Sequence, residues 1–395
     1  MSEQKVTKIY ERIIYIMGCA LNGIEPDVDY LSVVPTEDIF KYANAHSVGA
    51  LVTYALERAK IAPAEAVTEK NMAIRKILLL DAERAALTRE LEARKIKYMP
   101  LKGVYLKEYY PAIGLRQMAD NDILFDPEYR REVRRIFESR GYTVEAYEGS
   151  NHDVYLKAPV YNYEMHVSLF DSYHRGRLAD YFSDPFSKAV RIAGTEYGYK
   201  MTDEDFYIYV KAHEYKHFTS GGTGLRAFSD TYAFLSKRGE QLDCDYLDKE
   251  FKTLGIDEYV AKIESIARTL LGKDFISSMP EGFEKTLPEE LYEIFRYMCQ
   301  SGSYGIMEHN VDNDISRLVK DEGSVGKAKF KYIFRRMFPP MSYYKANQPF
   351  YYKHKYLIPF FVIKKLLRNL FVTPKYSFKY LGKILGYKGK KEKKD

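Results

Sequence analysis

The chain has 395 residues, of which 46% are hydrophobic and 29% are charged, and its net charge is +6. These proportions are those of a globular protein and exclude a wholly disordered or collagen-like chain, while the length leaves room for about two to four domains. The three cysteines lie far apart in the sequence, which excludes a compact zinc ribbon.

Residues 1 to about 95 show helical periodicity. Apolar residues recur at helical spacing from Ile39 to Leu56, after Thr36, which we expect to cap that helix. A second helix is expected from about Thr68 to Lys95.

The pattern changes after residue 95 to short segments that are typical of a small mixed sheet. The expected strands are residues 96–99, 119–125, 143–147, 153–157 and 161–169, and short helices are expected at 103–110 and 127–140. Helical periodicity returns from about residue 202 to residue 319. Prolines divide the last 70 residues into shorter pieces.

The expected fold class is therefore α+β, with a helical N-terminal region, a small mixed-sheet core and a helical C-terminal half that ends in a basic aromatic tail. We expect the domains to comprise an N-terminal helical region at 1–95, the core at 96–200, a helical domain at 201–325 and the tail at 326–395.

Acidic residues in two of the expected strands are the first sign of chemistry. Because alternate side chains of a strand share a face, Asp120 and Asp122 point the same way, and so do Glu164 and His166. Carboxylates held close together are unfavourable unless a cation neutralises them, and Mg²⁺ prefers oxygen ligands. Two aspartates and a glutamate on adjacent strands suit two-metal phosphoryl or nucleotidyl transfer, although an isolated D-x-D also occurs at solvated strand ends.

A larger set of separated positions agrees with one family pattern. These positions are Leu101-Lys102-Gly103, Leu106, Tyr110-Pro111, Gly114-Leu115-Arg116, Met118, Asp120, Asp122, Leu124, Glu164, His166, His213, His217, Gly224-Leu225-Arg226 and Asp230. At these positions the sequence resembles the bacterial uncharacterised nucleotidyltransferase family, which is a branch of the polymerase-beta-like superfamily. The resemblance extends from about residue 36 to residue 235. The resemblance implies a polymerase-beta-like nucleotidyltransferase core near residues 96–200.

The resemblance also implies roles for individual residues. Asp120 and Asp122 would hold two magnesium ions, and Glu164 would complete the shell of one ion and favour deprotonation of an acceptor hydroxyl. Gly103 would begin the helix that approaches the triphosphate. Lys102 and the amide of Gly103 would stabilise charge on the triphosphate.

The sequence departs from the family pattern at two positions. Superfamily members generally have a Gly-Ser pair at the start of that helix, whereas Val104 follows Gly103 here, so Lys102 is expected to supply the charge on the phosphate. Asn121 stands where an apolar residue is usual, and an amide on a buried face needs a hydrogen-bond partner.

Four further residues are candidates for the wall of the site. Arg116 either clamps a phosphate or neutralises the acidic residues. His166 either orients a ligand or is an ordinary histidine at the end of a sheet. Arg226 and Asp230 are four residues apart, which predicts a local ion pair, although the family pattern retains both residues.

Residues 213–217 match the H-E-x-x-H pattern of zinc hydrolases on an expected helix. The spacing puts His213 and His217 on one face, where zinc could be held with Glu214 as a base. Lys216 would place a cation beside the ligands, and no third ligand lies at a familiar offset, so we favour histidines that line the site. By the resemblance, this helix packs beside the nucleotide, and either histidine could contact substrate.

The glycine-rich run at residues 221–224 has two interpretations. Glycines let backbone amides approach a phosphate, but glycine also ends helices, and Thr223 could cap the helix that follows. We favour the capping interpretation.

The expected activity is the transfer of a nucleoside monophosphate from an NTP, with ATP as the expected donor, to an unidentified acceptor with release of pyrophosphate. Two Mg²⁺ ions are the expected cofactors. The alternatives are a zinc-dependent hydrolase that uses His213, Glu214 and His217, and a catalytically inactive protein that binds a nucleotide or a surface.

The tail differs from the rest of the chain in charge. Residues 326–395 contain 19 basic and two acidic residues, whereas residues 1–325 contain 42 basic and 53 acidic residues, a net charge of −11. The tail is expected to pack on this acidic body or to contact an anionic membrane surface, and RNA is a less favoured partner. Sequence-specific DNA binding is not expected.

The expected location is the cytoplasm, with peripheral contact to the inner membrane surface as a further option. The cysteine content fits a reducing compartment. Residues 1–8 are polar and do not resemble a signal peptide, and the sequence has no run of about 18 apolar residues that would span a membrane.

Overall fold

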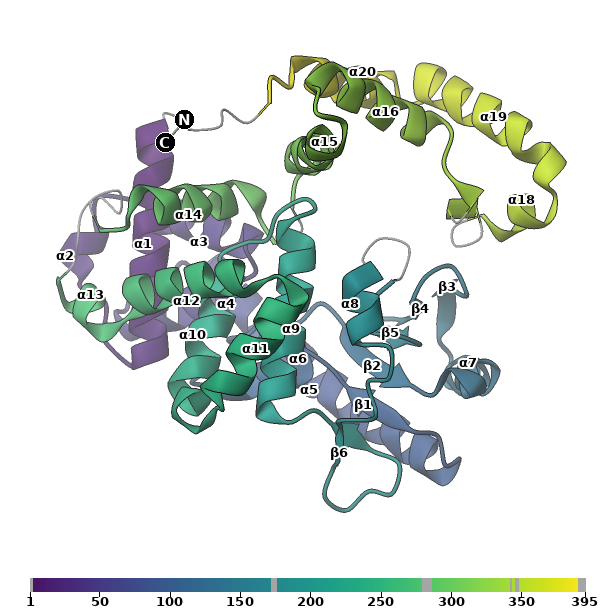
Figure 1. The fold of residues 1–395 in the computed structure, drawn as a ribbon. Helices are drawn as coiled ribbons and strands as arrows, with labels where there is room; N and C mark the ends of the chain where they lie inside the picture. Colours follow the sequence, from purple (N-terminus) through teal and green to yellow (C-terminus); the bar gives the residue numbers. More distant parts are fainter. Residues whose placement is uncertain are drawn as a thin grey trace.

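The computed structural model describes residues 3–171, 176–278, 286–303, 305–341, 343–344 and 348–389. Helices form both ends of the chain, and a five-stranded mixed sheet lies between them (Figure 1). The expected α+β fold class is therefore confirmed. Every helix in the described ranges is too short or too polar to cross a bilayer.

The N-terminal region is helical, as expected, but its helices are divided differently. They are α1 (Glu3–Asn22), α2 (Val28–Leu31), α3 (Thr36–Ala45), α4 (Gly49–Arg58) and α5 (Ala64–Ala93). The single helix expected from Thr36 to Leu56 is wrong, because the chain turns at Ser47, which has a φ of 55°. Thr36 also does not cap α3. The N-cap position is Pro35, which makes no side-chain hydrogen bond.

The central sheet contains all five expected strands. They are β1 (Tyr98–Pro100), β2 (Asn121–Phe125), β3 (Thr143–Ala146), β4 (His152–Lys157) and β5 (Tyr161–His166), in the order β1-β2-β5-β4-β3. β2 and β5 are parallel, and the other neighbours are antiparallel. The register sets Asp122 beside Glu164 and His152 beside His166. A separate pair, β6 (Val190–Arg191) and β7 (Tyr199–Lys200), was not predicted because each strand has only two residues.

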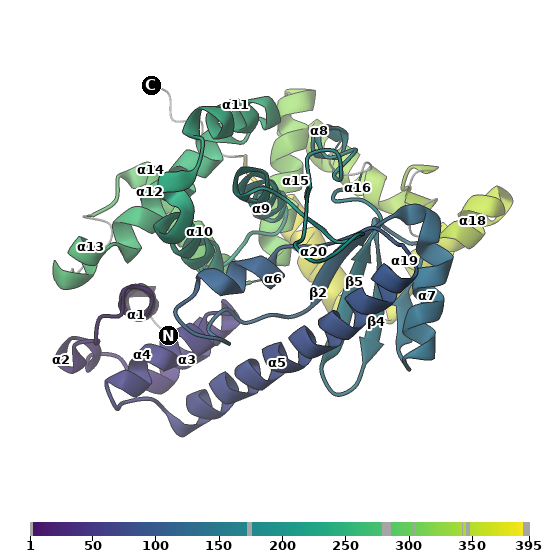
Figure 2. The ribbon, with the colours of Figure 1, turned by 90° about the horizontal axis from the view of Figure 1, so that it is seen from below.

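The two faces of the sheet have different surroundings. Helices α5 and α7 (Arg130–Ser139) cover one face, where Leu91 and Phe137 belong to the same apolar core as Ile123 (Figure 2). On the other face, Leu124 joins the larger core to which α9 (Asp203–Phe218) also contributes. Short segments connect these parts: α6 (Gly103–Leu106) and 3-10 turns at Lys107–Tyr109, Pro127–Tyr129, Gly239–Gln241 and Lys355–Leu357.

The buried amide of Asn121 finds its partners on α5. Its Nδ2 donates to the carbonyl oxygen of Leu80 at 3.2 Å, and its Oδ1 accepts a hydrogen bond from Arg84 at 3.0 Å. The side chain has no exposed surface. An apolar residue is usual at this position in the family, but here polar groups of α5 supply the hydrogen-bond partners that a buried amide needs.

The C-terminal half is built from helices in two groups. They are α8 (Gly176–Tyr181), α9, α10 (Arg226–Arg238), α11 (Cys244–Leu254), α12 (Asp257–Leu271), α13 (Lys273–Ser278), α14 (Glu289–Ser301), α15 (Met307–Glu322), α16 (Val325–Met337), α18 (Pro349–Lys353), α19 (Ile358–Phe371) and α20 (Pro374–Gly386). The helices α9 to α14 share a core with α1, α3 and α4. A smaller core joins α15 to α16 and α20, so this packing continues across residue 325.

Replacing the buried amide tests how strongly α5 is held on the sheet. Asn121→Ala is expected to lower the free energy of unfolding by about 1–3 kcal/mol, because two buried hydrogen bonds are lost. Urea unfolding followed by circular dichroism measures the change. Asn310→Ala, at an exposed position of α15, is the control and should unfold like the wild type. Equal stability of both variants would contradict the role of Asn121.

Candidate active site

A cavity of about 390 Å³ lies between the sheet and the helices α9 and α10. This volume is within the usual range of small-molecule sites. All eleven site residues predicted from the sequence line it: Lys102, Gly103, Arg116, Asp120, Asp122, Glu164, His166, His213, His217, Arg226 and Asp230. The fold therefore brings these residues together, and their individual roles remain predictions.

Asp122 is a buried carboxylate of the cavity that two side chains contact. Its Oδ1 accepts a hydrogen bond from the Lys102 ammonium at 2.8 Å and lies 2.8 Å from Nε2 of His166. Burial raises the pKa of this carboxyl, but the charge of Lys102 and the contact with His166 outweigh burial and hold the pKa below its usual value. Asp122 is therefore ionised in the buried site.

The negative charge of Asp120 is less well balanced by nearby cations than that of Asp122. Burial, followed by the negative charges of Asp122 and Glu164, raises the pKa of Asp120 to about 6. Asp120, Asp122 and Glu164 thus face one cavity, and the repulsion between these three carboxylates favours the binding of a cation. Oxygen ligands of this kind fit Mg²⁺.

His152 of β4 extends the cluster and was missed by the sequence analysis. Oε2 of Glu164 lies 3.8 Å from Nε2 of His152 and 3.6 Å from Nε2 of His166. Ligand atoms of these three residues lie within 4.8 Å of one another, and among the residues that the structure describes this is the one such group that could hold a metal ion. Only the β4–β5 register sets His152 opposite His166, so a motif search along the sequence had no signal for it.

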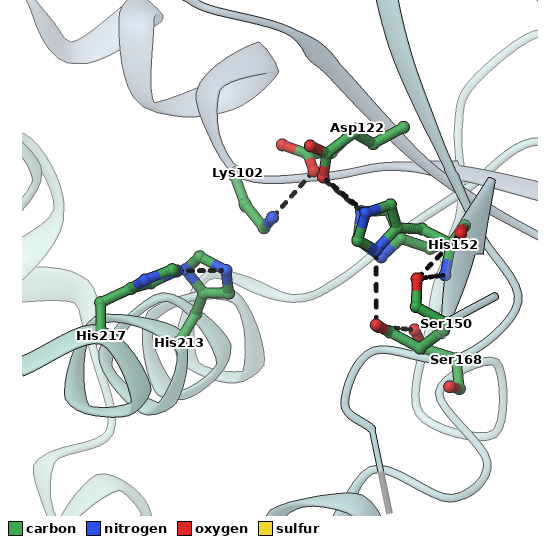
Figure 3. A network of polar contacts seen from close by, with 10 residues as sticks. Lys102, Asp122, Ser150, His152, Ser168, His213 and His217 are labelled. Carbon is green, nitrogen blue, oxygen red and sulfur yellow. Dashed lines mark hydrogen bonds and ion pairs between the residues drawn. The ribbon is translucent and has the colours of Figure 1, made fainter. Parts of the chain in front are cut away.

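Lys102 reaches the carboxylates from a strained backbone position. Its φ of 44° and ψ of −111° lie outside the regions that side-chain-bearing residues prefer, at a typical cost of about 1–3 kcal/mol. At the next residue, Gly103, a Cβ would lie 2.7 Å from a guanidinium nitrogen of Arg116, so a side chain there would have to displace that guanidinium. This turn places the Lys102 ammonium between Asp122 and the histidines of α9 (Figure 3).

Arg116 has a partner that the sequence analysis did not foresee. Its Nε and one terminal nitrogen donate to the two carboxylate oxygens of Asp230 at 2.7 and 2.9 Å, and Tyr110 donates to the same carboxylate at 2.7 Å. The expected ion pair between Arg226 and Asp230 is therefore wrong. Arg226 instead contacts the carbonyl oxygen of Gln117 at 3.5 Å.

The ion pair with Asp230 also bears on the role expected for Arg116. Its side chain is only 8% exposed, and two of its three guanidinium nitrogens donate to the carboxylate of Asp230, so its main contact is with neither Asp120 nor Asp122. The phosphate clamp stays a prediction. The ion pair instead ties the segment before β2 to α10. The Arg116–Asp230 pair thus holds together two segments that line the cavity.

The two histidines of α9 form the wall opposite the carboxylates. Nε2 of His213 lies 3.3 Å from Nε2 of His217, and both rings face Lys102 across the cavity (Figure 3). Burial, followed by the positive charge of Lys102, holds the pKa of His213 well below its usual value, so the ring is neutral at pH 7. A neutral imidazole can accept a hydrogen bond from a substrate.

The zinc-hydrolase interpretation is not favoured by these contacts. Glu214 accepts hydrogen bonds from Lys211 at 3.1 Å and from Tyr259 at 2.8 Å, so its carboxylate is already engaged. Within the described ranges, no third metal-ligating side chain joins His213 and His217.

The glycine-rich run serves close packing. The expected cap at Thr223 is wrong, because the N-cap of α10 is Leu225, which makes no side-chain hydrogen bond. The glycine part of the capping interpretation holds in that the amide of Gly222 donates to the carbonyl oxygen of His217 in the last turn of α9 at 3.0 Å. A Cβ on Gly224 would lie 2.7 Å from Nδ1 of His46 and 2.9 Å from the carbonyl carbon of Gly302. Glycine at this position lets three distant segments meet behind the cavity.

Comparisons with known proteins locate the cavity within a recognised family. A family model described as an uncharacterised nucleotidyltransferase matches residues 33–272, which contain the sheet and every cavity residue discussed above. No curated protein and no solved structure matches the chain.

The buried ion pair between Arg116 and Asp230 gives a stability prediction. Asp230→Ala is expected to lower the free energy of unfolding by about 3–5 kcal/mol, because the Arg116 guanidinium would be left buried without its carboxylate. The matched control is Arg134→Ala, which breaks an exposed pair with Glu138 that has a similar N–O distance of 2.8 Å. Urea unfolding of the control should match the wild type. If both variants lost a similar amount of unfolding free energy, burial of the ion pair would not be the cause of the destabilisation.

Proposed function

Since the chain belongs to the uncharacterised nucleotidyltransferase family, we propose that it transfers a nucleoside monophosphate from an NTP, with ATP as the first donor to test, to an acceptor nucleophile. In this reaction the acceptor oxygen forms a bond to the α-phosphorus, the bond from that phosphorus to the bridging oxygen breaks, and pyrophosphate leaves. The observation that carries the proposal is that Asp120, Asp122 and Glu164 converge in one cavity. Lysine and arginine side chains line the same cavity.

The carboxylates are the residues that would hold a divalent cation. Asp122 and Glu164 are direct neighbours across β2 and β5, and Asp120 lies at the entrance to β2 with a raised pKa. Oxygen ligands suit Mg²⁺, and the adjacent imidazoles of His152 and His166 would also suit Mn²⁺. When bound, the ion would neutralise charge on the transferred phosphate and favour deprotonation of the acceptor.

Basic side chains on both sides of the cavity would bind the triphosphate. Lys102 approaches from the sheet side, while Lys216 and Arg226 line the cavity from α9 and α10. A triphosphate placed between these walls would meet positive charge along its length. The strained turn at Lys102 fixes the direction from which one of these charges approaches.

The histidines of α9 would contact the parts of the substrate that carry no charge. His213 and His217 line the cavity on the far side of Lys102 from Asp122 (Figure 3). With its pKa lowered by burial, His213 can accept a hydrogen bond from a ribose or acceptor hydroxyl.

Loss of either aspartate should abolish transfer. Asp120→Asn and Asp122→Asn are each expected to lower turnover by about a thousandfold or more, because a metal ligand supports several kcal/mol of transition-state stabilisation. The assay incubates the protein with each α-labelled NTP, Mg²⁺ and pools of candidate acceptors. Glu145→Gln is the matched control, because Glu145 is exposed on β3 of the same sheet and does not line the cavity. Normal turnover in both aspartate variants would refute the site assignment.

Lys102 should act mainly on nucleotide binding. Lys102→Gln is expected to raise the Kd for an NTP by about 10- to 100-fold, because it removes a charged hydrogen bond worth about 1.5–3 kcal/mol. Isothermal titration with a non-hydrolysable ATP analogue and Mg²⁺ measures the change. An unaltered Kd would place the triphosphate away from Lys102.

A further inference from the structure

The last helices of the chain combine positive charge with exposed apolar side chains. Residues 323–391 contain 17 lysines and arginines and no aspartate or glutamate. Of the 21 large hydrophobic side chains that are exposed in the described part of the chain, 15 lie between residues 330 and 385. Proteins that remain monomeric in water rarely expose such a concentration of apolar surface.

These helices form an arm that is anchored on α15. We use the name "the arm" for α16, α18, α19 and α20, which lie together at the top of Figure 1. α16 and α20 share a core with α15, and Lys379 and Lys383 form ion pairs with Glu308 and Asp312 of α15 at 2.6 and 2.7 Å. The contacts with α15 therefore use one side of α16 and α20.

A continuous apolar stripe runs along α19. Phe360, Ile363, Leu367 and Phe371 follow one another at intervals of three or four residues, so they share one helix face, and their exposed fractions are 67%, 54%, 51% and 72%. α16 and the residue that follows it carry a similar exposed series at Phe330, Phe334 and Phe338. α20 carries another at Phe378, Leu381 and Leu385. Each of the three longer helices of the arm is thus apolar on a face that meets solvent.

A groove inside the arm holds a cluster of cations. A cavity of about 460 Å³ between α16, α19 and α20 is lined by apolar side chains together with Arg336, Lys365 and Arg368. No acidic residue lines this cavity. Burial, followed by the charges of Arg336 and Arg368, lowers the pKa of Lys365, which shows that the three cations are close enough to repel one another. Cations beside an apolar lining complement an anionic head group that carries alkyl chains.

We propose that the arm docks on the surface of a bilayer that contains anionic phospholipids. The apolar stripe of α19 would enter the boundary between head groups and acyl chains, and Arg336, Lys365 and Arg368 would bind lipid phosphates. α19 has 14 residues, too few to cross a bilayer, so the helix lies in the plane of the surface. This docking does not depend on the proposed transfer activity.

Vesicle sedimentation of the full chain tests the proposal. Binding to vesicles of phosphatidylcholine and phosphatidylglycerol should be at least about tenfold tighter than binding to phosphatidylcholine alone, and added salt should weaken it. The variant Phe360→Gln/Leu367→Gln/Phe371→Gln should lose at least about tenfold in affinity. The matched control Val33→Gln/Met72→Gln/Leu78→Gln changes three apolar residues outside the arm that are each more than half exposed, and it should bind like the wild type.

A second variant tests the cations of the groove, and it can still contradict the proposal if the first variant misfolds. Arg336→Gln/Arg368→Gln should bind the anionic vesicles more weakly and retain the melting temperature of the wild type. Equal binding of the wild type to both kinds of vesicle, or undiminished binding by both variants, would overturn the proposal. So would stabilisation by inorganic phosphate without sedimentation, which would indicate a soluble anion. Binding of single-stranded RNA without sedimentation would likewise favour an RNA partner instead.

Discussion

The parallel pairing of β2 with β5 is the constraint on which the candidate active site depends. Its register sets Asp122 directly beside Glu164, and strand alternation directs Asp120 toward the same cavity. The resulting repulsion is only partly offset by Lys102 and His166, which bind Asp122 and leave Asp120 with a raised pKa. Like charges held this close repel one another, and this repulsion is the basis of the proposed cation site.

The rest of the fold holds this arrangement from both sides. Asn121, between the two aspartates, bonds to α5 on the covered face of the sheet. Arg116, in the segment before β2, is bound to Asp230 of α10, which joins the sheet to the helical half of the molecule. The cavity therefore lies between the sheet and the helices of the larger core, and buried polar contacts at its edges hold the strands and helices in place.

The sequence predicts much of this site because the relevant patterns are local. Strand alternation places the acidic side chains on one face, and helical spacing places both histidines of α9 on one side. The pairing of Arg116 with Asp230 is not predictable in this way, because 114 residues separate the partners and the nearby Arg226 satisfies the local rule. The position of His152 beside His166 depends on the register between β4 and β5. The expected caps at Thr36 and Thr223 are wrong because α3 and α10 begin after other residues, Pro35 and Leu225.

The central claim is that the three carboxylates form a cation-dependent nucleotide site. Electron paramagnetic resonance of Mn²⁺, titrated into the protein with a non-hydrolysable ATP analogue, tests it most directly. The account predicts that wild-type protein binds Mn²⁺ and that Glu164→Gln weakens this binding by at least about tenfold, since one of few anionic ligands is lost. Wild-type protein that leaves Mn²⁺ in solution, or a Glu164→Gln variant that binds it equally well, would contradict the account.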